Sequence, residues 1–181
     1  MISSMLSRTY RDPSDARAKE LLNSLLDENI SPDNYQQAML RLGRHLGIRL
    51  RSSINPKKKY CIVATAEDVD FLAKGIMESL SGHVDELFLT CFWNERSNIN
   101  GGSIAPIYNT YLETGYESAE ELIVVKSIIS SSCVVKTNIT ALFDEVKPEV
   151  IHVVAPVVQT ESEEGLKHQF PKSIAKLMNF T

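Results

Sequence analysis

The sequence predicts an α/β fold in which a parallel sheet is flanked by helices and preceded by two further helices. From residue 59 onward, short apolar runs of strand length alternate with helical patterns. Such alternation is typical of parallel sheets with right-handed crossovers. Residues 150–158 read Val-Ile-His-Val-Val-Ala-Pro-Val-Val, which is apolar on both faces, as a strand buried inside a parallel sheet would be.

Two amphipathic helices are expected before the sheet. Residues 12–15 combine capping side chains with a proline, and leucines at helical spacing follow. Ser31 and Pro32 are suited to the N-cap and first turn of the second helix, whose apolar positions recur at steps of three and four up to Leu50. A solvated basic face and a surface facing a phosphate or a partner both fit the arginines of this helix, which are Arg41, Arg44, Arg49 and Arg51.

The remaining elements follow from local patterns. Strands are expected at residues 60–64, 86–93, 122–125 (with a continuation to 129) and 150–158. Helices are expected at residues 66–81, 137–147, 161–170 and 171–178, with a polar loop at 94–106 and no assignable pattern at 108–116. We expect a single domain over residues 1–181, with an N-terminal helical segment at 1–52 and an α/β core at 59–170.

Composition excludes several classes of protein. The chain is 43% hydrophobic and 23% charged with a net charge of −4, so no general basic excess indicates a nucleic acid partner. No apolar run approaches the ~20 residues that span a bilayer, and residues 1–11 lack the apolar stretch of a secretory signal. The three cysteines, Cys61, Cys91 and Cys133, fit no zinc spacing and are expected to be free thiols. We therefore expect a cytoplasmic protein without a membrane partner.

In parallel α/β sheets, ligands bind beyond the carboxyl ends of the strands. That rule selects the loops that start at Thr65, Asn94, Ser130 and Gln159. The most informative of them leads into the helix expected at Thr137-Asn138-Ile139-Thr140, because backbone N–H groups and hydroxyls at a helix N-terminus form an anion site. Positive charge is added nearby by two lysines, Lys126 and Lys136.

Residues 35–170 resemble the phosphoribosyltransferase family, which has a Rossmann-like sheet. In that family a strand ends in two acidic residues, followed by two hydrophobic residues and a Thr-Gly-x-Thr loop that holds the sugar 5-phosphate. The resemblance places Ser132-Cys133 at the acidic pair, Val134-Val135 at the hydrophobic positions and residues 137–140 at the phosphate loop. It places residues 65–68 at the loop that faces pyrophosphate.

A second register takes Ile62-Val63 followed by Glu67-Asp68 as the acidic signature, although no Thr-Gly loop follows it. In the first register, serine and cysteine supply no negative charge to a developing oxocarbenium ion, a loss worth several kcal/mol or about 10³-fold in rate. Glu67 and Asp68 repel a pyrophosphate unless Mg²⁺ intervenes.

The resemblance implies two functions. The first is transfer of a phosphoribosyl group from phosphoribosyl pyrophosphate to a base with Mg²⁺, and the second is a non-catalytic subunit that senses a nucleotide or binds a protein, including a second copy of itself. A plain dinucleotide-binding module is a third possibility, but the chain lacks a Gly-x-Gly-x-x-Gly turn.

The candidate site residues fall into three groups, with no catalytic residue assigned and no metal motif. The ligand-binding group is Lys126, Ser130, Ser131, Ser132, Cys133, Lys136, Thr137, Asn138 and Thr140. The pyrophosphate loop is Thr65, Ala66, Glu67 and Asp68, and the candidate lid is Arg96, Gly101 and Gly102. His152 is expected to be a satisfied core residue, and Cys133 a small buried one rather than a nucleophile.

Overall fold

The computed structural model describes residues 9–95, 97–99, 102–130 and 132–181. Its two N-terminal helices are α1 (Ala16–Ser24) and α2 (Pro32–Leu50). Asp15 caps α1 by accepting a hydrogen bond from the Ala18 N–H at 2.9 Å. Ser31 caps α2 by accepting one from the Asn34 N–H at 3.3 Å. Both predicted helix starts are therefore confirmed, because local capping chemistry determines them.

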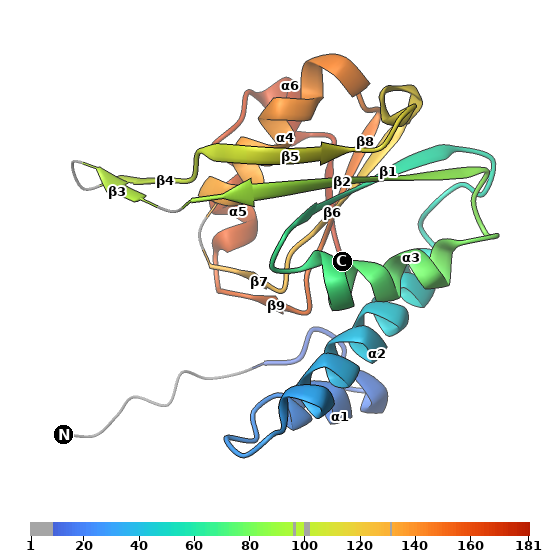
Figure 1. Ribbon diagram of the computed structural model, residues 1–181, viewed down its shortest axis with the longest axis vertical. Helices are drawn as coiled ribbons and strands as arrows, with labels where there is room; N and C mark the ends of the chain where they lie inside the picture. The colour runs from blue at the N-terminus through green and yellow to red at the C-terminus, as the bar shows by residue number, and fades with distance from the viewer. Residues whose placement is uncertain (1–8, 96, 100–101, 131) are drawn as a thin grey trace.

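Among the described residues, six strands form the main sheet in the order β10-β8-β6-β1-β2-β5. These strands are β1 (Lys59–Thr65), β2 (Glu86–Asn94), β5 (Ile107–Leu112), β6 (Glu121–Val125), β8 (Val150–Val154) and β10 (Met178–Phe180). All neighbouring strands pair in parallel except β2 and β5, which pair antiparallel. The predicted α/β class with a mostly parallel sheet is confirmed (Figure 1).

Helices cover both faces of the sheet. The connection from β1 to β2 runs through one π-helical turn, η1 (Val69–Ala73), and α3 (Lys74–Leu80). The connection from β6 to β8 runs the other way across the sheet through α4 (Cys133–Val146). Because the crossovers move in opposite directions, their helices lie on opposite faces. One face packs on α1–α3 and the other on α4, α5 (Ser162–Lys167) and α6 (Lys172–Ala175).

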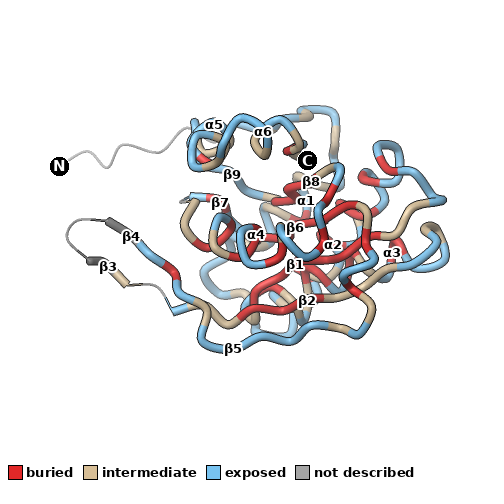
Figure 2. Tube along the Cα trace, turned by 90° about the horizontal axis from the view of Figure 1, so that it is seen from above, coloured by how far each residue is buried: buried red, intermediate tan, exposed pale blue. Residues whose placement is uncertain are grey.

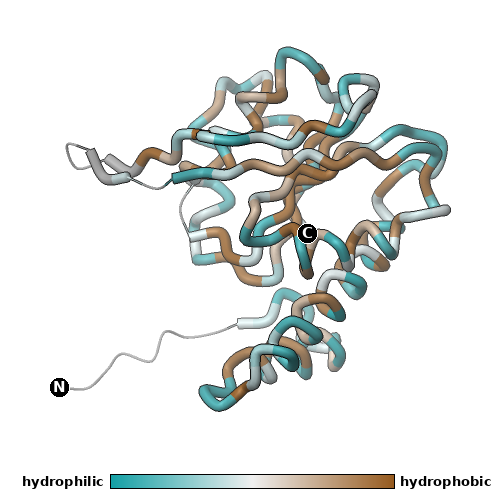
Figure 3. The backbone as a smooth tube through the Cα atoms, in the orientation of Figure 1, coloured by the Kyte–Doolittle hydropathy of each residue, from teal (hydrophilic) through white to brown (hydrophobic). Residues whose placement is uncertain are grey.

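The central strands are apolar because both of their faces are covered. All five residues of β6 are buried, as are six of the seven in β1. Figure 2 shows these strands as buried, and Figure 3 shows the brown of apolar side chains concentrated along them. A near-continuous apolar run is what a doubly covered parallel strand requires. None of the described helices combines the length and the apolarity that crossing a membrane needs.

Helices α2 and α3 cross with their backbones almost in contact. A Cβ atom on Gly43 would lie 2.1 Å from the carbonyl oxygen of Leu72, and one on Gly75 would lie 2.3 Å from that of Leu40. Only glycine fits at either position without a shift of backbone. This crossing holds the N-terminal helices on the sheet.

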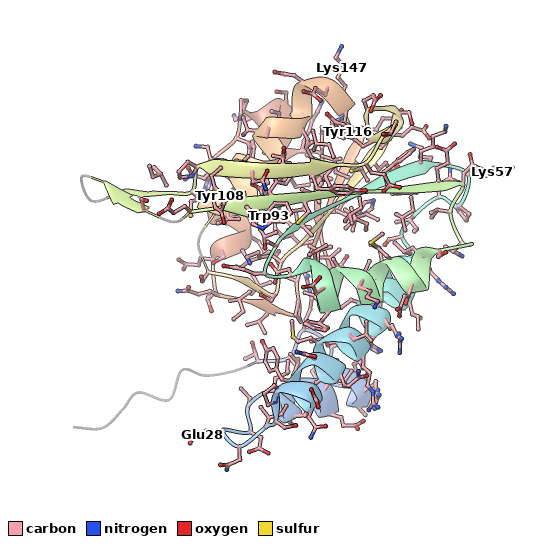
Figure 4. All side chains as sticks on the ribbon, viewed as in Figure 1. Glu28, Lys57, Trp93, Tyr108, Tyr116 and Lys147 are labelled. Carbon is pink, nitrogen blue, oxygen red and sulfur yellow. The ribbon has the colours of Figure 1, made fainter. Side chains whose placement is uncertain are left out.

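The segment between β2 and β6 differs from the expectation. The predicted polar loop contains an antiparallel hairpin, β3 (Ser97–Ile99) and β4 (Gly102–Ile104), and the unassigned tyrosine-rich segment contains β5. Strand β5 is the edge strand of the sheet and pairs with β2, where Tyr108 lies near Trp93 (Figure 4). Its side chains are mostly exposed, and that of Tyr108 is 67% exposed. Without a buried face, the sequence of this strand carries no alternation to detect.

Two other boundaries are corrected. Strand β6 stops at Val125, and Ile128–Ile129 forms a separate strand, β7, which pairs with β9 (Val157–Val158). The expected strand at 150–158 is therefore split at Pro156, whose nitrogen cannot donate to a ladder. The last predicted helix ends at Ala175, and Met178–Phe180 adds strand β10 to the sheet beside β8.

Candidate functional site

The sheet reverses its winding between β1 and β6. From β1 the chain moves to β2 on one side, and from β6 it moves to β8 on the other. The carboxyl ends of these two adjacent parallel strands, Thr65 and Val125, therefore border the crevice in which such sheets bind ligands. The predicted pyrophosphate loop and Lys126 meet at this switch point.

A buried ion pair bridges the switch point. The Nζ atom of Lys126 lies 2.5 Å from Oδ2 of Asp68, 3.1 Å from Oε2 of Glu67 and 3.5 Å from Oγ1 of Thr65. The side chains of Lys126 and Asp68 are only 6% and 1% exposed, whereas that of Glu67 is 76% exposed. An ammonium group has three donors, so these three oxygens saturate it.

Asp68 is equally well satisfied. Its Oδ2 atom accepts a second hydrogen bond from the hydroxyl of Thr65 at 2.8 Å, and its Oδ1 accepts the backbone N–H of Ser127 at 3.1 Å. The carboxylate thus ties the loop after β1 to the residues after β6. The sequence placed both charged groups in the site but gave no sign that they pair.

The structure corrects the expected start of the helix that follows β6. Helix α4 begins at Cys133 rather than Thr137, and the Thr137 hydroxyl donates to the Cys133 carbonyl at 2.9 Å, a bond made inside a helix. Strand β6 ends at Val125, so the residues that directly follow it are Lys126-Ser127 and then Ile128-Ile129. The polar loop then starts at Ser130. The helix start was missed because the serines before Cys133 suit a loop and a cap equally well.

Several predicted ligand-binding residues do come together at the start of α4. A cavity of about 460 Å³ is lined by Ser132, Cys133, Lys136, Thr137, Gln169 and residues 104–106 at the base of the hairpin. Lys136 Nζ lies 3.3 Å from Oε1 of Gln169 and is otherwise exposed to solvent. The N-terminus of α4 adds a partial positive charge.

Other predicted residues lie elsewhere. Asn138 is buried and exchanges two amide hydrogen bonds with Asn94, at 2.9 and 3.2 Å. Thr140 is exposed on the next turn of α4 and does not line the cavity. Gly102 begins β4, whereas Arg96, Gly101 and Ser131 lie outside the described residues. Asn94 starts one of the selected loops, but it lies at the end of β2 bonded to Asn138 and does not line the cavity.

The residues at the switch point do not fit a magnesium ion. Both oxygens of Asp68 are engaged, and the ammonium of Lys126 lies where a second cation would have to approach. Within the part of the chain that the structure describes, no three His, Cys, Asp or Glu side chains gather as metal ligands would. Mg²⁺ needs several oxygen ligands in near-octahedral geometry, and this set does not offer them.

Other titratable groups are structural. His152 is buried as predicted, with Nε2 2.8 Å from Oε2 of Glu121. Glu121 is the first residue of β6, so it lies at the end of that strand away from the switch point. Burial acts to raise the pKa of Glu121, but hydrogen bonds from His152 and Lys58 outweigh it and leave that pKa lowered. Burial raises the pKa of Cys61 to about 12 and also raises that of Cys91, so neither thiol is a nucleophile at neutral pH.

A second cavity of about 570 Å³ lies between α1, α2 and residues 155–164. Three of its charged side chains pair with one another: Asp15 Oδ2 lies 2.7 Å from Nε2 of His45 and 3.0 Å from Nη1 of Arg49. The cavity is lined by Gln159, which starts one of the selected loops, but by none of the residues predicted to bind phosphate or pyrophosphate. The start of α4 is therefore the better candidate for a ligand site.

Sheet order, flanking helices and switch-point loops together define a protein with a phosphoribosyltransferase-like fold. Among solved structures, the chain is similar to the AQ2163 protein from Aquifex aeolicus, with a TM-score of 0.74, 12% identity and coverage of 93% of this chain and 83% of that one. It is similar to a hypoxanthine phosphoribosyltransferase from Staphylococcus aureus, with a TM-score of 0.51, 14% identity and coverage of 68% and 65%.

A third similar structure is a hypothetical protein from Neisseria gonorrhoeae with bound ppGpp, with a TM-score of 0.50, 12% identity and coverage of 83% and 85%. No protein-family model matches the sequence, and no curated protein matches it either. At these identities the likeness shows the fold alone.

Proposed function

We propose that this protein is a non-catalytic binding module on a phosphoribosyltransferase-like fold, and that it holds a phosphorylated ribose or a nucleotide with its phosphate at the start of α4. One observation carries this proposal. The first turn of α4 opens on a cavity that Lys136 and Thr137 line, and the ammonium of Lys136 is exposed to solvent beside it. The dipole of a helix adds partial positive charge at its N-terminus, and an anion bound there is stabilised by it.

The size and charge of this cavity support the proposal. Its volume of about 460 Å³ lies within the range of roughly 300–1,000 Å³ that is usual for small-molecule sites. Lys136 supplies a full positive charge in addition to the helix dipole. The ppGpp bound to the Neisseria gonorrhoeae protein of similar fold is a phosphorylated nucleotide, which supports the same class of ligand here.

Transfer of a phosphoribosyl group to a base is the second candidate, favoured by the fold likeness to hypoxanthine phosphoribosyltransferase. The residues after β6 oppose it. A lysine and a serine, Lys126-Ser127, directly follow β6, whereas the family pattern has an acidic pair at the end of a strand. Neither residue supplies a carboxylate to a developing oxocarbenium ion, and preorganised charge is the main source of catalysis in such steps.

Titration calorimetry with ribose 5-phosphate and with GMP tests the proposal. We expect Lys136→Ala to weaken binding by about tenfold or more, since a hydrogen bond to a charged group contributes roughly 1.5–3 kcal/mol. Lys74→Ala is the matched control, because Lys74 is exposed on α3, on the other face of the sheet. Equal affinity in the two variants, or no heat from a folded wild-type protein, would contradict the proposal.

A pyrophosphate-release assay with phosphoribosyl pyrophosphate, Mg²⁺ and a panel of bases separates the two candidates. The binding module releases none, and base-dependent release would establish the transferase. A homodimer or a protein partner stays a prediction, which the mass of the protein in solution measures directly.

A further inference from the structure

The switch-point crevice, which holds metal and pyrophosphate in the transfer reaction that the resemblance implies, is closed here by charged side chains. We infer that the Lys126 ammonium occupies the place of a divalent cation, so that the protein binds 5′-monophosphates without metal and excludes phosphoribosyl pyrophosphate. The metal half of this inference, that the crevice binds no divalent cation, depends only on the ion pair. The ligand half, that monophosphates bind without metal and phosphoribosyl pyrophosphate is excluded, rests on the proposed function.

The first step is the saturation of the ion pair. Asp68 gives Oδ2 to Lys126 and Thr65, and Oδ1 to the backbone N–H of Ser127. Lys126 in turn faces three oxygens and is almost fully buried. A metal ion would have to displace the ammonium from these oxygens, and the displaced charge would remain buried beside it.

The second step concerns the backbone of the loop after β1. Phosphate-binding loops hold their ligand with inward-pointing N–H groups. Here the Ala66 N–H donates to the carbonyl of Phe92 at 3.0 Å, and the Asp68 N–H donates to the carbonyl of Thr65 at 2.9 Å. Both donors are therefore used within the fold and are not offered to a pyrophosphate.

The third step is the charge that remains. Two carboxylates, Asp68 and Glu67, share one ammonium, so the cluster carries a net charge of −1 when all three groups are ionised. The exposed member is Glu67, with 76% of its side chain accessible. A pyrophosphate that entered the crevice would meet this carboxylate first, whereas a single phosphate at the start of α4 would meet Lys136.

Direct metal binding tests the first half without any nucleotide. Mn²⁺ is titrated into the full chain and followed by electron paramagnetic resonance, for the wild type, Lys126→Met and the double variant Lys126→Met/Asp68→Asn. We expect no site in the wild type and none in the double variant. We expect one site in the single variant, where Glu67 and Oδ2 of Asp68 no longer bind an ammonium and water can complete the coordination of Mn²⁺. A wild-type site that Asp68→Asn removes, or a folded Lys126→Met protein that binds no Mn²⁺, would overturn the inference.

Calorimetry with GMP and phosphoribosyl pyrophosphate tests the second half. GMP should bind with the same affinity, within twofold, in 5 mM MgCl₂ and in EDTA, and phosphoribosyl pyrophosphate at least a hundredfold more weakly than GMP. GMP binding that requires Mg²⁺, or equal binding of the two ligands, would overturn the inference and leave the proposed function standing. Failure of both ligands to bind would refute the proposed function, while the Mn²⁺ titration would still decide the metal half.

Discussion

Replacing Lys126 by methionine is expected to destabilise the protein strongly. The substitution keeps an unbranched side chain of similar length and removes only the charge and its donors. It leaves Asp68, whose side chain is 1% exposed, as a buried carboxylate without a counter-ion. Removing one partner of a buried ion pair costs about 3–5 kcal/mol, because the remaining charge is neither solvated nor compensated.

The magnitude for this pair lies at the lower end of that range. Asp68 keeps the hydrogen bonds from the Thr65 hydroxyl, at 2.8 Å, and from the Ser127 N–H, at 3.1 Å. We therefore expect a loss of about 3 kcal/mol in the free energy of unfolding. With a slope near 2 kcal/mol per molar urea, the unfolding midpoint should fall by about 1.5 M.

Urea unfolding followed by circular dichroism measures this loss, with Asp68→Asn and the double variant completing a thermodynamic cycle. The double variant removes both charges and should lie within about 1 kcal/mol of the wild type. The coupling energy is then at least about 2 kcal/mol, and larger by whatever Asp68→Asn costs alone. The reasoning is refuted if Lys126→Met costs less than about 1 kcal/mol, or if the double variant loses as much as the two single variants together.

Three further predictions concern other parts of the fold. Gly75→Ala places a Cβ against the backbone of α2 and should lower the free energy of unfolding by about 1–3 kcal/mol through overpacking. Gly165→Ala, where a Cβ would have nothing within 4 Å, should leave it unchanged or raise it. Thermal melts compare the two variants. Because the folded-state pKa of Glu121 is lowered from 4.5, its stabilising contribution is present above that pH and is lost as the pH falls through the folded value. In the Glu121→Gln variant, the free energy of unfolding should therefore fall less steeply as the pH is lowered. Ellman's reagent should label the half-buried Cys133 before the two buried cysteines, which react only on unfolding; equal rates would contradict the burial.

Local chemistry made much of the fold predictable. The caps at Asp15 and Ser31 lie next to the helices they start, and the apolar runs of β1, β2, β6 and β8 reflect burial on both faces. The edges of the sheet were not predictable in this way. Strand β5 exposes most of its side chains, and Met178–Phe180 is a strand because of its pairing with β8. Such elements are fixed by a neighbour and not by their own sequence.

In the candidate site, too, local features were predictable from the sequence and long-range contacts were not. The rule that ligands bind at carboxyl ends of strands selected the loop at Thr65, which borders the switch point. It placed the end of the neighbouring strand before Ser130, whereas β6 ends at Val125. The pairing of Asp68 with Lys126 joins residues far apart in sequence and depends on the register of β1 against β6. The start of α4 was misplaced because consecutive serines before Cys133 suit a loop and a cap equally well.

The most direct test of the central claim is an amide chemical-shift titration of ¹⁵N-labelled protein with ribose 5-phosphate. The account predicts saturable shifts that are largest for the amides of Ser132, Cys133 and Val134 at the start of α4, and unchanged when Mg²⁺ is replaced by EDTA. Shifts that concentrate instead on the second cavity, between α1, α2 and residues 155–164, or spectra that do not change at all, would contradict it.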